Sequence, residues 1–205
     1  MFTGIIQEIG TVAKVERRNG LVRLSIHAPR TASRVQLLES VAVNGVCLSV
    51  VGIRQPVMTF EVIRETLHLT SLGALRKGEQ VNLEPSLSML DRLSGHLLFG
   101  HVDGMGTILK RRQRVGELVL EVRVPVQMKR FIVSKAPVAV DGVSLTVGER
   151  LTASTFTVHL IPETLRQTIL RARMVGDRVN VELDYFAKLI WQFLKARRVA
   201  EDSSS

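Results

Sequence analysis

The ten residues VAVNGVCLSV at positions 41–50 return at positions 138–147 as VAVDGVSLTV. Seven of the ten positions are identical. The other three keep similar size and polarity: Asn44/Asp141, Cys47/Ser144 and Ser49/Thr146. Self-similarity at a fixed spacing indicates a duplicated structural unit. The pair therefore predicts that the chain holds two copies of one fold.

The repeat extends outward from this pair with its order preserved. Upstream, residues 4–12 correspond to residues 100–108, an offset of 96. Downstream, residues 65–84 correspond to residues 163–182, an offset of 98. Two copies of about 90 residues are too few and too long for a solenoid, whose units are short and numerous. Each copy is therefore expected to be a domain of its own.

Each copy has the pattern of a small β-structure. Apolar and polar residues alternate over 22–26 and 118–122, which is typical of half-buried strands. Asn44-Gly45 and Asp141-Gly142 are hairpin turn signals. Several short strands of this kind predict a closed β-barrel, which leaves no sheet edge exposed. The Glu-Thr-Leu segments that begin at Glu65 and Glu163 are predicted to be short helical stretches between strands.

The repeat stops after Glu182, and the end of the chain has a different pattern. Residues 187–198 have amphipathic helical spacing, with an apolar stripe and then basic residues: Leu189, Ile190, Phe193, Leu194, Lys195, Arg197 and Arg198. Residues 201–205 are expected to be a disordered polar tail. We divide the chain into a first barrel (1–88), a linker (89–97), a second barrel (98–186) and a helix with its tail (187–205).

The composition of the 205-residue chain, 45% hydrophobic and 23% charged, is that of an ordinary globular protein. No apolar run approaches the roughly 20 residues that cross a bilayer, and we expect no membrane association. The N-terminus has an early Glu8 and no basic flank, unlike a signal peptide. Cys47 is the single cysteine, so no intrachain disulfide can form and a cytoplasmic location is favoured.

The formal net charge of +9 has two interpretations, a nucleic-acid partner or a solvated basic surface. The basic residues are scattered, with clusters only at 110–114 and 195–198. One Trp and one Tyr are available for base stacking, and both lie near the C-terminus. We favour the solvated surface and expect no nucleic-acid partner.

Seven strings of residues now resemble one known family, that of riboflavin synthases with tandem lumazine-binding barrels. They are MFTGII, VNGVCLSV, RETLHLTSLG, GHLLFGHVDG, DGVSLTV, IPETLRQTIL and VNVELD, and they span residues 1–186. The resemblance implies an all-β fold of two six-stranded barrels and a C-terminal helix. It also implies a homotrimer, held by that helix, with active sites between the N-terminal barrel of one subunit and the C-terminal barrel of its neighbour.

The activity implied by the resemblance is a transferase reaction between two molecules of 6,7-dimethyl-8-ribityllumazine. One receives a four-carbon unit and becomes riboflavin, and the other becomes 5-amino-6-(D-ribitylamino)uracil. No cofactor or metal is expected. The sequence has neither a Walker-type phosphate loop nor a dinucleotide fingerprint, and His96 and His101 form a poor zinc pattern.

This chemistry needs a group that removes a proton from the 7-methyl carbon and a nucleophile that adds to the other ring. We expect His101 to transfer the proton, since histidine titrates near neutral pH; the alternative is a histidine at a strand end. Cys47 could be a nucleophile, a hydrogen-bonding group or a small buried hydrophobe. The resemblance adds Ser144, Thr146 and Ser40 to the catalytic candidates.

The substrate-binding residues are also implied by the resemblance. They are Gly4, Ile5, Ile6, Cys47, Leu48, Ser49, Glu61, Val62, Ile63, Arg64, Glu65, Thr66, Gly100, His101, Val102, Lys135, Ser144, Leu145, Thr146, Ile161, Pro162, Glu163, Thr164, Leu165 and Arg166. Backbone groups suit the uracil-like edge of the ring, and Glu and Thr side chains suit the ribityl hydroxyls. The alternatives are helix capping for the Glu-Thr-Leu segments and a plain surface charge for Lys135. Asn82 and Asn180 are expected to cap turns.

Two departures from the family pattern concern the linker region. Ser94 replaces a usual glycine, and a positive φ there would strain the serine. Phe99 stands where the family has a polar residue. A non-catalytic lumazine- or flavin-binding protein is the rival interpretation. The sequence leaves open which barrel binds the donor, whether hydride transfer or a nucleophilic adduct starts the reaction, and whether the chain associates with lumazine synthase.

Overall fold

The computed structural model describes residues 1–18, 20–150, 152 and 154–202. Over these residues, each copy of the repeat forms six strands. The first copy contains β1 (Glu8–Arg18), β2 (Leu21–His27), β3 (Ser40–Val43), β4 (Val46–Arg54), β5 (Val57–Ile63) and β6 (Gln80–Pro85). The second contains β7 (Gly104–Arg114), β8 (Glu117–Arg123), β9 (Pro137–Val140), β10 (Val143–Arg150), β11 (Thr155–Leu160) and β12 (Arg178–Leu183).

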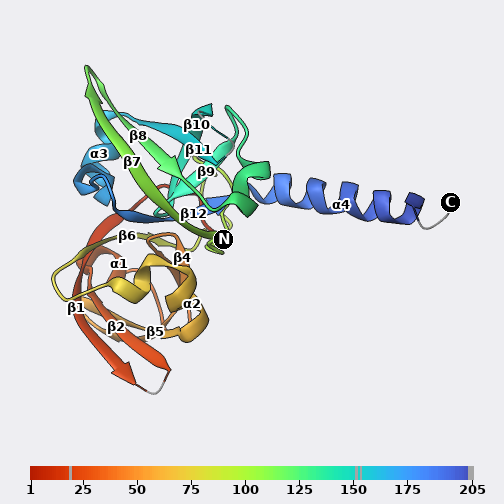
Figure 1. Cartoon of the computed structure of the whole chain (residues 1–205). Coiled ribbons are helices and arrows are strands. Elements are labelled where there is room, and N and C mark those ends of the chain that lie inside the picture. The colour runs from red at the N-terminus through yellow and green to blue at the C-terminus, as the bar shows by residue number, and fades with distance from the viewer. Residues whose placement is uncertain (19, 151, 153, 203–205) are drawn as a thin grey trace.

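Each set of strands closes into an antiparallel barrel, and the two barrels lie side by side (Figure 1). In the first barrel the strands follow the order β1-β2-β5-β4-β3-β6. The second barrel has the same order for the equivalent strands, β7-β8-β11-β10-β9-β12. Closure comes from β6 pairing with β1 and from β12 pairing with β7. The predicted all-β fold of two tandem barrels is confirmed.

Short helices join the strands at equivalent places. In the described chain they are α1 (Pro29–Ala32), α2 (Arg64–Leu69), η1 (Ser71–Ala74), η2 (Val126–Phe131), α3 (Pro162–Gln167) and η3 (Ile169–Ala172), where η marks a 3-10 helix. The predicted helical stretches at the Glu-Thr-Leu segments are α2 and α3.

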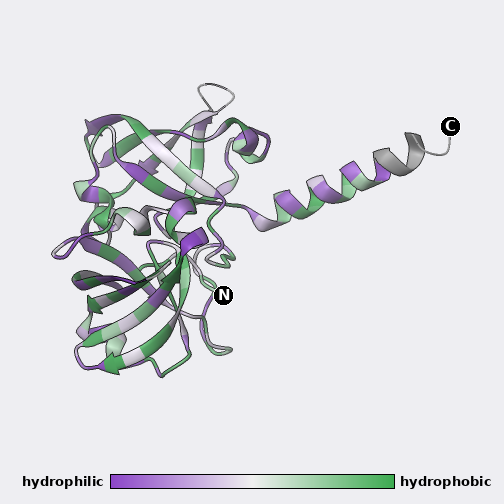
Figure 2. Cartoon of the chain, turned by 60° about the horizontal axis from the view of Figure 1, so that its bottom comes forward, coloured by the Kyte–Doolittle hydropathy of each residue, from purple (hydrophilic) through white to green (hydrophobic). Residues whose placement is uncertain are grey.

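Each barrel has its own apolar core. Hydrophobic and hydrophilic residues alternate along the strands (Figure 2), so that one side of each strand lines the interior. Phe60 lies at the centre of the first core and Phe156 at the equivalent place in the second, both fully buried. Burying one such side chain contributes about 1.5–3 kcal/mol. A third cluster, made of Phe2, Ala42, Leu98 and Ala139, lies between the barrels.

The two barrels meet where their equivalent hairpin turns face each other, at Gly45 and Gly142. A Cβ atom on Gly45 would lie 2.7 Å from the Gly142 nitrogen, and one on Gly142 would lie 2.6 Å from the Gly45 nitrogen. Both glycines have φ of +78°. Because the contact joins equivalent residues of the two barrels, an approximate two-fold axis passes through it. Only glycine fits at these two positions.

Two buried asparagines exchange hydrogen bonds across this axis. Asn82 Nδ2 donates to the carbonyl of Asp141, and Asn180 Nδ2 donates to the carbonyl of Asn44, at 2.9 and 2.8 Å. Asn82 Oδ1 accepts from the nitrogen of Ile169, and Asn180 Oδ1 from that of Ser71. These nitrogens begin η3 and η1. The asparagines do cap turns, as expected, but each caps a turn of the opposite barrel.

One ion pair breaks the symmetry beside this axis. Asp141 Oδ2 accepts from Arg173 Nη2 at 2.6 Å and from Nε at 2.9 Å, and the Asp141 side chain is fully buried. In the first barrel the equivalent positions hold the neutral Asn44 and Leu75. The Nδ2 atom of Asn44 is buried and has no hydrogen-bond partner among the described residues.

The C-terminal helix α4 (Tyr185–Asp202) projects away from the second barrel (Figure 1). It begins two residues before the predicted start and continues to Asp202, so the prediction of a disordered tail from residue 201 is wrong for 201 and 202. Five of the seven residues from Ala196 to Asp202 are good helix formers, Ala, Arg or Glu, which favours continuation of the helix. Residues 203–205 lie outside the described chain. Among the described residues, no helix is both long and apolar enough to span a bilayer.

Only the first turns of α4 pack on the second barrel. The Tyr185 ring lies 4.6 Å from that of Phe99, and the Trp191 ring lies 5.8 Å from that of Phe131. Lys188 Nζ donates to both carboxylate oxygens of Asp103 at 2.9 Å. All residues of the predicted apolar stripe are exposed, from 43% for Leu189 to 71% for Phe193.

We predict that Asn82→Ala lowers the free energy of unfolding by about 2–4 kcal/mol, because it leaves a buried N–H and a buried C=O without partners. Denaturant unfolding followed by fluorescence would measure the change. Gln36→Ala, an exposed amide, is the control and should change stability by less than about 0.5 kcal/mol. Equal effects of the two substitutions would contradict the role given to Asn82.

Candidate functional site

Two glycine-containing segments each belong to one copy of the repeat and lie against the other barrel, next to the candidate site residues there. The first, residues 3–6, precedes β1 of the first barrel, yet the Gly4 carbonyl accepts from Ser144 N of the second at 2.8 Å. The second, residues 99–102, precedes β7, yet the Gly100 carbonyl accepts from Cys47 N of the first barrel at 2.9 Å. Each segment therefore lies beside a strand of the opposite barrel, the first beside β10 and the second beside β4.

The apolar residues of the segments follow the same exchange. Val102 is buried in the core of the first barrel, and Ile6 packs against the core of the second. Each barrel is therefore completed by a residue from the other copy of the repeat. The exchange also decides which candidate residues come together, because Cys47 joins His101 on one side and Ser144 joins Ile5 on the other.

Glycine is required in both segments. Gly4 and Gly100 have φ of +77° and +72°, a region that disfavours residues with a side chain. A Cβ atom on Gly4 would lie 2.6 Å from Ser144 Cβ, and one on Gly100 would lie 2.6 Å from Cys47 Cβ. The backbone can thus lie flat against the candidate side chains only where glycine stands.

Buried carboxylates hold both segments. Glu84 accepts from Thr3 N and Thr3 Oγ1, both at 2.7 Å, and from Gly4 N at 2.9 Å. Glu182 accepts from Phe99 N at 2.8 Å and from Gly100 N at 3.1 Å. Burial raises the pKa of both carboxyl groups, and the donated N–H bonds partly oppose that rise. We did not predict these two residues, although the repeated pattern Val-Asn-x-Glu at 81–84 and 179–182 marked them.

The first half-site, as we call the group on the first barrel, contains Cys47, Ser49, Ser40 and His101. Ser40 and Ser49 are paired across β3 and β4. The free thiol of Cys47 is partly buried, and Ser49 is exposed on the same strand. His101 is exposed, and the centroid of its ring lies 6.1 Å from that of the Phe99 ring, so the residue that departs from the family pattern is a neighbour of His101.

The second half-site, on the second barrel, contains Ser144, Thr146, Ile5 and Lys135. Thr146 is exposed and is paired with Pro137, where the first barrel has Ser40. Lys135 is exposed with φ of 68°, and its N–H donates to the Val147 carbonyl at 2.8 Å. His96 from the linker also reaches this group, since its Nδ1 lies 2.7 Å from Ser144 Oγ. Ser94 does not have a positive φ, so the predicted strain is absent.

The remaining candidates lie where β5 and β11 end and α2 and α3 begin. In both copies the Glu and Thr side chains stand at the first turn of the short helix. Glu163 is engaged by Arg166 and Gln167, and the hydrogen bond from Arg166 lowers the pKa of its carboxyl. Val62 and Leu48 point into the first core, so they can offer a ligand only backbone atoms.

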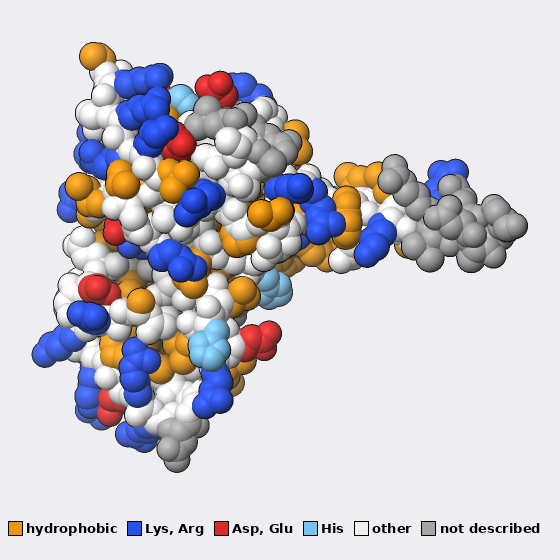
Figure 3. Space-filling view, in the orientation of Figure 1, with side chains coloured by type: hydrophobic (Ala, Val, Ile, Leu, Met, Phe, Trp, Pro, Cys, Tyr) orange, Lys and Arg blue, Asp and Glu red, His pale blue; other side chains and the backbone are white. Residues whose placement is uncertain are grey.

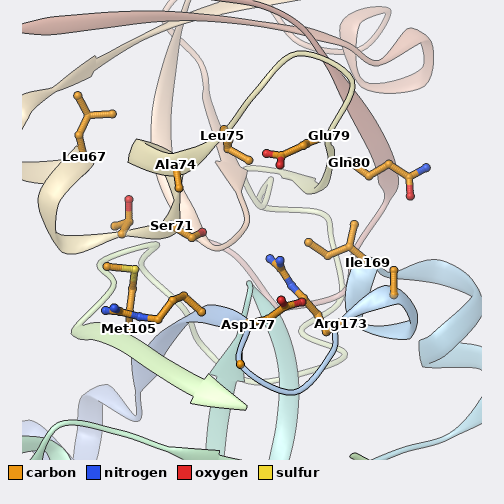
Figure 4. Close-up of a pocket in the computed structure, with 14 residues that line it drawn as sticks. Leu67, Ser71, Ala74, Leu75, Glu79, Gln80, Met105, Ile169, Arg173 and Asp177 are labelled. Atoms are coloured by element: carbon orange, nitrogen blue, oxygen red, sulfur yellow. The ribbon is translucent and has the colours of Figure 1, made fainter. Parts of the chain in front are cut away.

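A cavity of about 630 Å³ between the barrels is separate from both half-sites (Figure 4). It is lined by η1, η3 and the turns before β6 and β12, with Arg173, Asp177 and Glu79 among the polar side chains. No predicted site residue lines it. Ile5 borders a different cavity of about 370 Å³, and Arg64 borders one of about 380 Å³.

On the face seen in Figure 3, Lys and Arg side chains are scattered over both barrels, apart from one close group at the upper end of the second barrel. Several of them pair with carboxylates, as Lys110 does with Glu121 at 3.3 Å and Arg114 with Glu117 at 3.5 Å. Pairing of this kind weakens the field that a polyanion would meet.

Comparison with known proteins gives consistent matches. A family model described as "Lumazine binding domain" matches the chain twice, at residues 3–86 and 99–184. The riboflavin synthase of Bacillus amyloliquefaciens is 38% identical over 95% of this chain and 90% of its own length. The riboflavin synthase of Mycobacterium bovis is 39% identical over 96% of this chain and 99% of its own length.

Solved structures match as well. LumP complexed with riboflavin has a TM-score of 0.84 at 25% sequence identity, covering 90% of this chain and 100% of LumP. LumP complexed with 6,7-dimethyl-8-(1'-D-ribityl) lumazine has a TM-score of 0.82, also at 25% identity, covering 90% of this chain and 99% of LumP.

We predict that Gly100→Ala destabilises the chain by about 3 kcal/mol or more, because the new methyl group meets the Cys47 backbone. Gly116→Ala is the matched control: its φ is +77°, but nothing lies within 4 Å of its Cβ position. The control should cost only the roughly 1–2 kcal/mol of a left-handed alanine. Thermal and denaturant unfolding of both variants would measure the difference, and equal losses would show that close approach at Gly100 is unimportant.

Proposed function

The chain belongs to the riboflavin synthase family of lumazine-binding proteins, and from that membership we propose how its two barrels divide the reaction. Its activity is the conversion of two molecules of 6,7-dimethyl-8-ribityllumazine into riboflavin and 5-amino-6-(D-ribitylamino)uracil, the final step of riboflavin biosynthesis. The observation that carries this is the relationship to curated riboflavin synthases at 36–39% identity over nearly the whole chain.

Each half-site binds one lumazine. The edge of the ring that resembles uracil can pair with backbone groups of the strand and the glycine segment, which lie side by side in each barrel. The ribityl chain then extends toward the first turn of α2 or α3, where Glu65 and Thr66, or Glu163 and Thr164, offer groups to its hydroxyls. Holding two rings in reacting geometry supplies a large part of the rate acceleration.

The residues of the two half-sites are chemically unequal, as a reaction between two identical molecules requires. On the first barrel, His101 takes the proton from the 7-methyl carbon of one lumazine. Cys47 either adds to a ring carbon or donates a hydrogen bond to the ring. On the second barrel, Ser144 and Thr146 hold the other lumazine, and Lys135 polarises a ring carbonyl. The four-carbon unit moves between the rings without an external oxidant, because the atoms of the two substrates equal those of the two products.

We propose that the active enzyme is a homotrimer in which the first half-site of one subunit faces the second half-site of its neighbour. Helix α4 supports this, since its stripe of Leu189, Ile190, Phe193 and Leu194 is exposed and it projects clear of the barrels (Figure 1). Within this proposal, residues 1–88 and 98–186 are the lumazine-binding domains, 89–97 the linker and 187–205 the trimerisation element. A cytoplasmic location is also proposed, in keeping with the single cysteine.

We predict that the purified chain forms riboflavin from the lumazine alone, as measured by riboflavin absorbance. Removing a general base typically costs about 10²–10⁴-fold in kcat, so His101→Ala should fall within this range, and Cys47→Ala should also lose turnover. Val115→Ala, a fully exposed residue, is the control. Tight fluorescent binding without turnover would instead support a binding protein such as LumP, and full turnover by both variants would refute the roles given to His101 and Cys47.

We predict that charging the stripe by Ile190→Glu and Phe193→Glu dissociates the trimer and abolishes turnover, because the carboxylates would be buried at the helix interface. Sedimentation velocity would follow the change from three chains to one chain of 22.8 kDa. Gln192→Glu on the same exposed helix is the charge control. A monomeric but fully active double variant would contradict a site shared between subunits.

A further inference from the structure

His96 connects the linker to the second half-site. Its ring Nδ1 lies 2.7 Å from Ser144 Oγ, and its backbone N–H donates to the Thr3 carbonyl at 3.2 Å. The preceding Gly95 allows this approach, since a Cβ atom there would lie 2.0 Å from the Thr3 oxygen and 2.9 Å from Ser144 Oγ. The linker is therefore laid against β10 and the first glycine segment together.

Among the described residues, the ring of His96 forms a hydrogen bond only with Ser144. The other ring nitrogen, Nε2, is buried and has no hydrogen-bond partner within the described chain. Burial lowers the pKa of His96, against the opposing charge of Asp184, so the ring is neutral near pH 7. A buried nitrogen without a partner costs stability. Packing alone would be served better by an apolar side chain, which points to the contact with Ser144 as the reason for histidine here.

From this geometry we propose that His96 is a positioning residue that orients the Ser144 hydroxyl toward the lumazine bound at the second half-site. The proposal rests on the proposed function of that half-site. A serine hydroxyl has one donor and two acceptor positions and rotates freely in water. In either tautomer the imidazole occupies one of these hydrogen-bonding positions of the hydroxyl. The remaining positions therefore point in fixed directions before the lumazine binds. Fixing a group before the reaction is what makes it effective in the transition state.

Within the described residues, the first half-site has no equivalent contact. The linker histidine His96 reaches Ser144 of the second barrel, whereas Cys47, the counterpart of Ser144, makes no side-chain hydrogen bond with a histidine. His96 thus contributes to the chemical difference between two half-sites that descend from one repeat.

A double-mutant cycle tests whether His96 acts through Ser144. The four proteins are the unaltered chain, His96→Leu, Ser144→Ala and the double variant. We expect His96→Leu to lower kcat about tenfold with KM changed less than about twofold, and to have almost no further effect once Ser144 is alanine. Equal effects of His96→Leu in both backgrounds would overturn the proposal.

Rescue separates positioning from packing. His96→Asn can place an amide near the Nδ1 position, and we expect it to restore kcat to within about threefold of the unaltered chain. His27→Leu, at the exposed end of β2, is the matched control and should keep full activity. Thermal unfolding of every variant accompanies the kinetics, and a loss of activity that follows only the loss of stability would also overturn the proposal.

The same proteins distinguish a failure of this inference from a failure of the proposed function. If the unaltered chain forms no riboflavin, the proposed function is wrong. In that case the cycle is measured with the dissociation constant of riboflavin for each of the four proteins, obtained from riboflavin fluorescence. The same measurement replaces kcat if Ser144→Ala turns over too slowly. Non-additive dissociation constants support the coupling of His96 to Ser144, and additive ones reject it.

Discussion

The contact between Gly45 and Gly142 is the constraint on which the rest of the structure depends. Two hairpin turns approach so closely that neither of these two positions can hold a residue with a side chain. This distance brings Asn82 and Asn180 within reach of the opposite barrel, where each satisfies backbone groups that would otherwise be buried without partners. It also lets the glycine segments cross the interface. A larger separation would remove all of these hydrogen bonds together.

The crossing of the glycine segments links stability to function. Each barrel receives an apolar residue from the other copy, and each candidate strand receives a backbone partner from it. Glu84 and Glu182 hold the two glycine segments in place by accepting buried hydrogen bonds from their backbone N–H groups. The groups proposed to meet the substrate are therefore fixed by the same contacts that hold the barrels together. Such support is what keeps a site within the small tolerance that catalysis demands.

Much of the fold could be predicted because the sequence contains two copies of the same pattern. The offsets of 96 to 98 located equivalent strands, the Asn-Gly and Asp-Gly pairs located the hairpins, and helical spacing located α4. The exchange between barrels could not be predicted, because it joins residues such as Asn44 and Asn180, which are 136 positions apart. Local periodicity carries no information on such pairs. Asn82 shows the limit well, since its capping role was evident but not the barrel it caps.

The site was predictable in its parts and not in its arrangement. Cys47, Ser144 and His101 stood out because they differ between the copies, yet nothing in the spacing placed His101 on the first barrel or Ile5 on the second. His96 was considered only as a poor zinc ligand. Its position in a segment outside the repeat was a signal that its role has no equivalent in the other half.

Beside the two-fold axis, two equivalent pairs of residues differ between the barrels. Because of this difference, a single residue of one barrel can no longer replace its equivalent in the other. Asp141 is matched by Arg173, whereas Asn44 is matched by Leu75. A chimera that grafted the aspartate alone into the first half would bury a carboxylate without the arginine that pairs with it in the second half. One that grafted the leucine alone into the second half would leave the existing carboxylate buried without its partner. Exchange between the halves has to move both members of a pair, so the original duplication now survives as coupled units rather than as single positions.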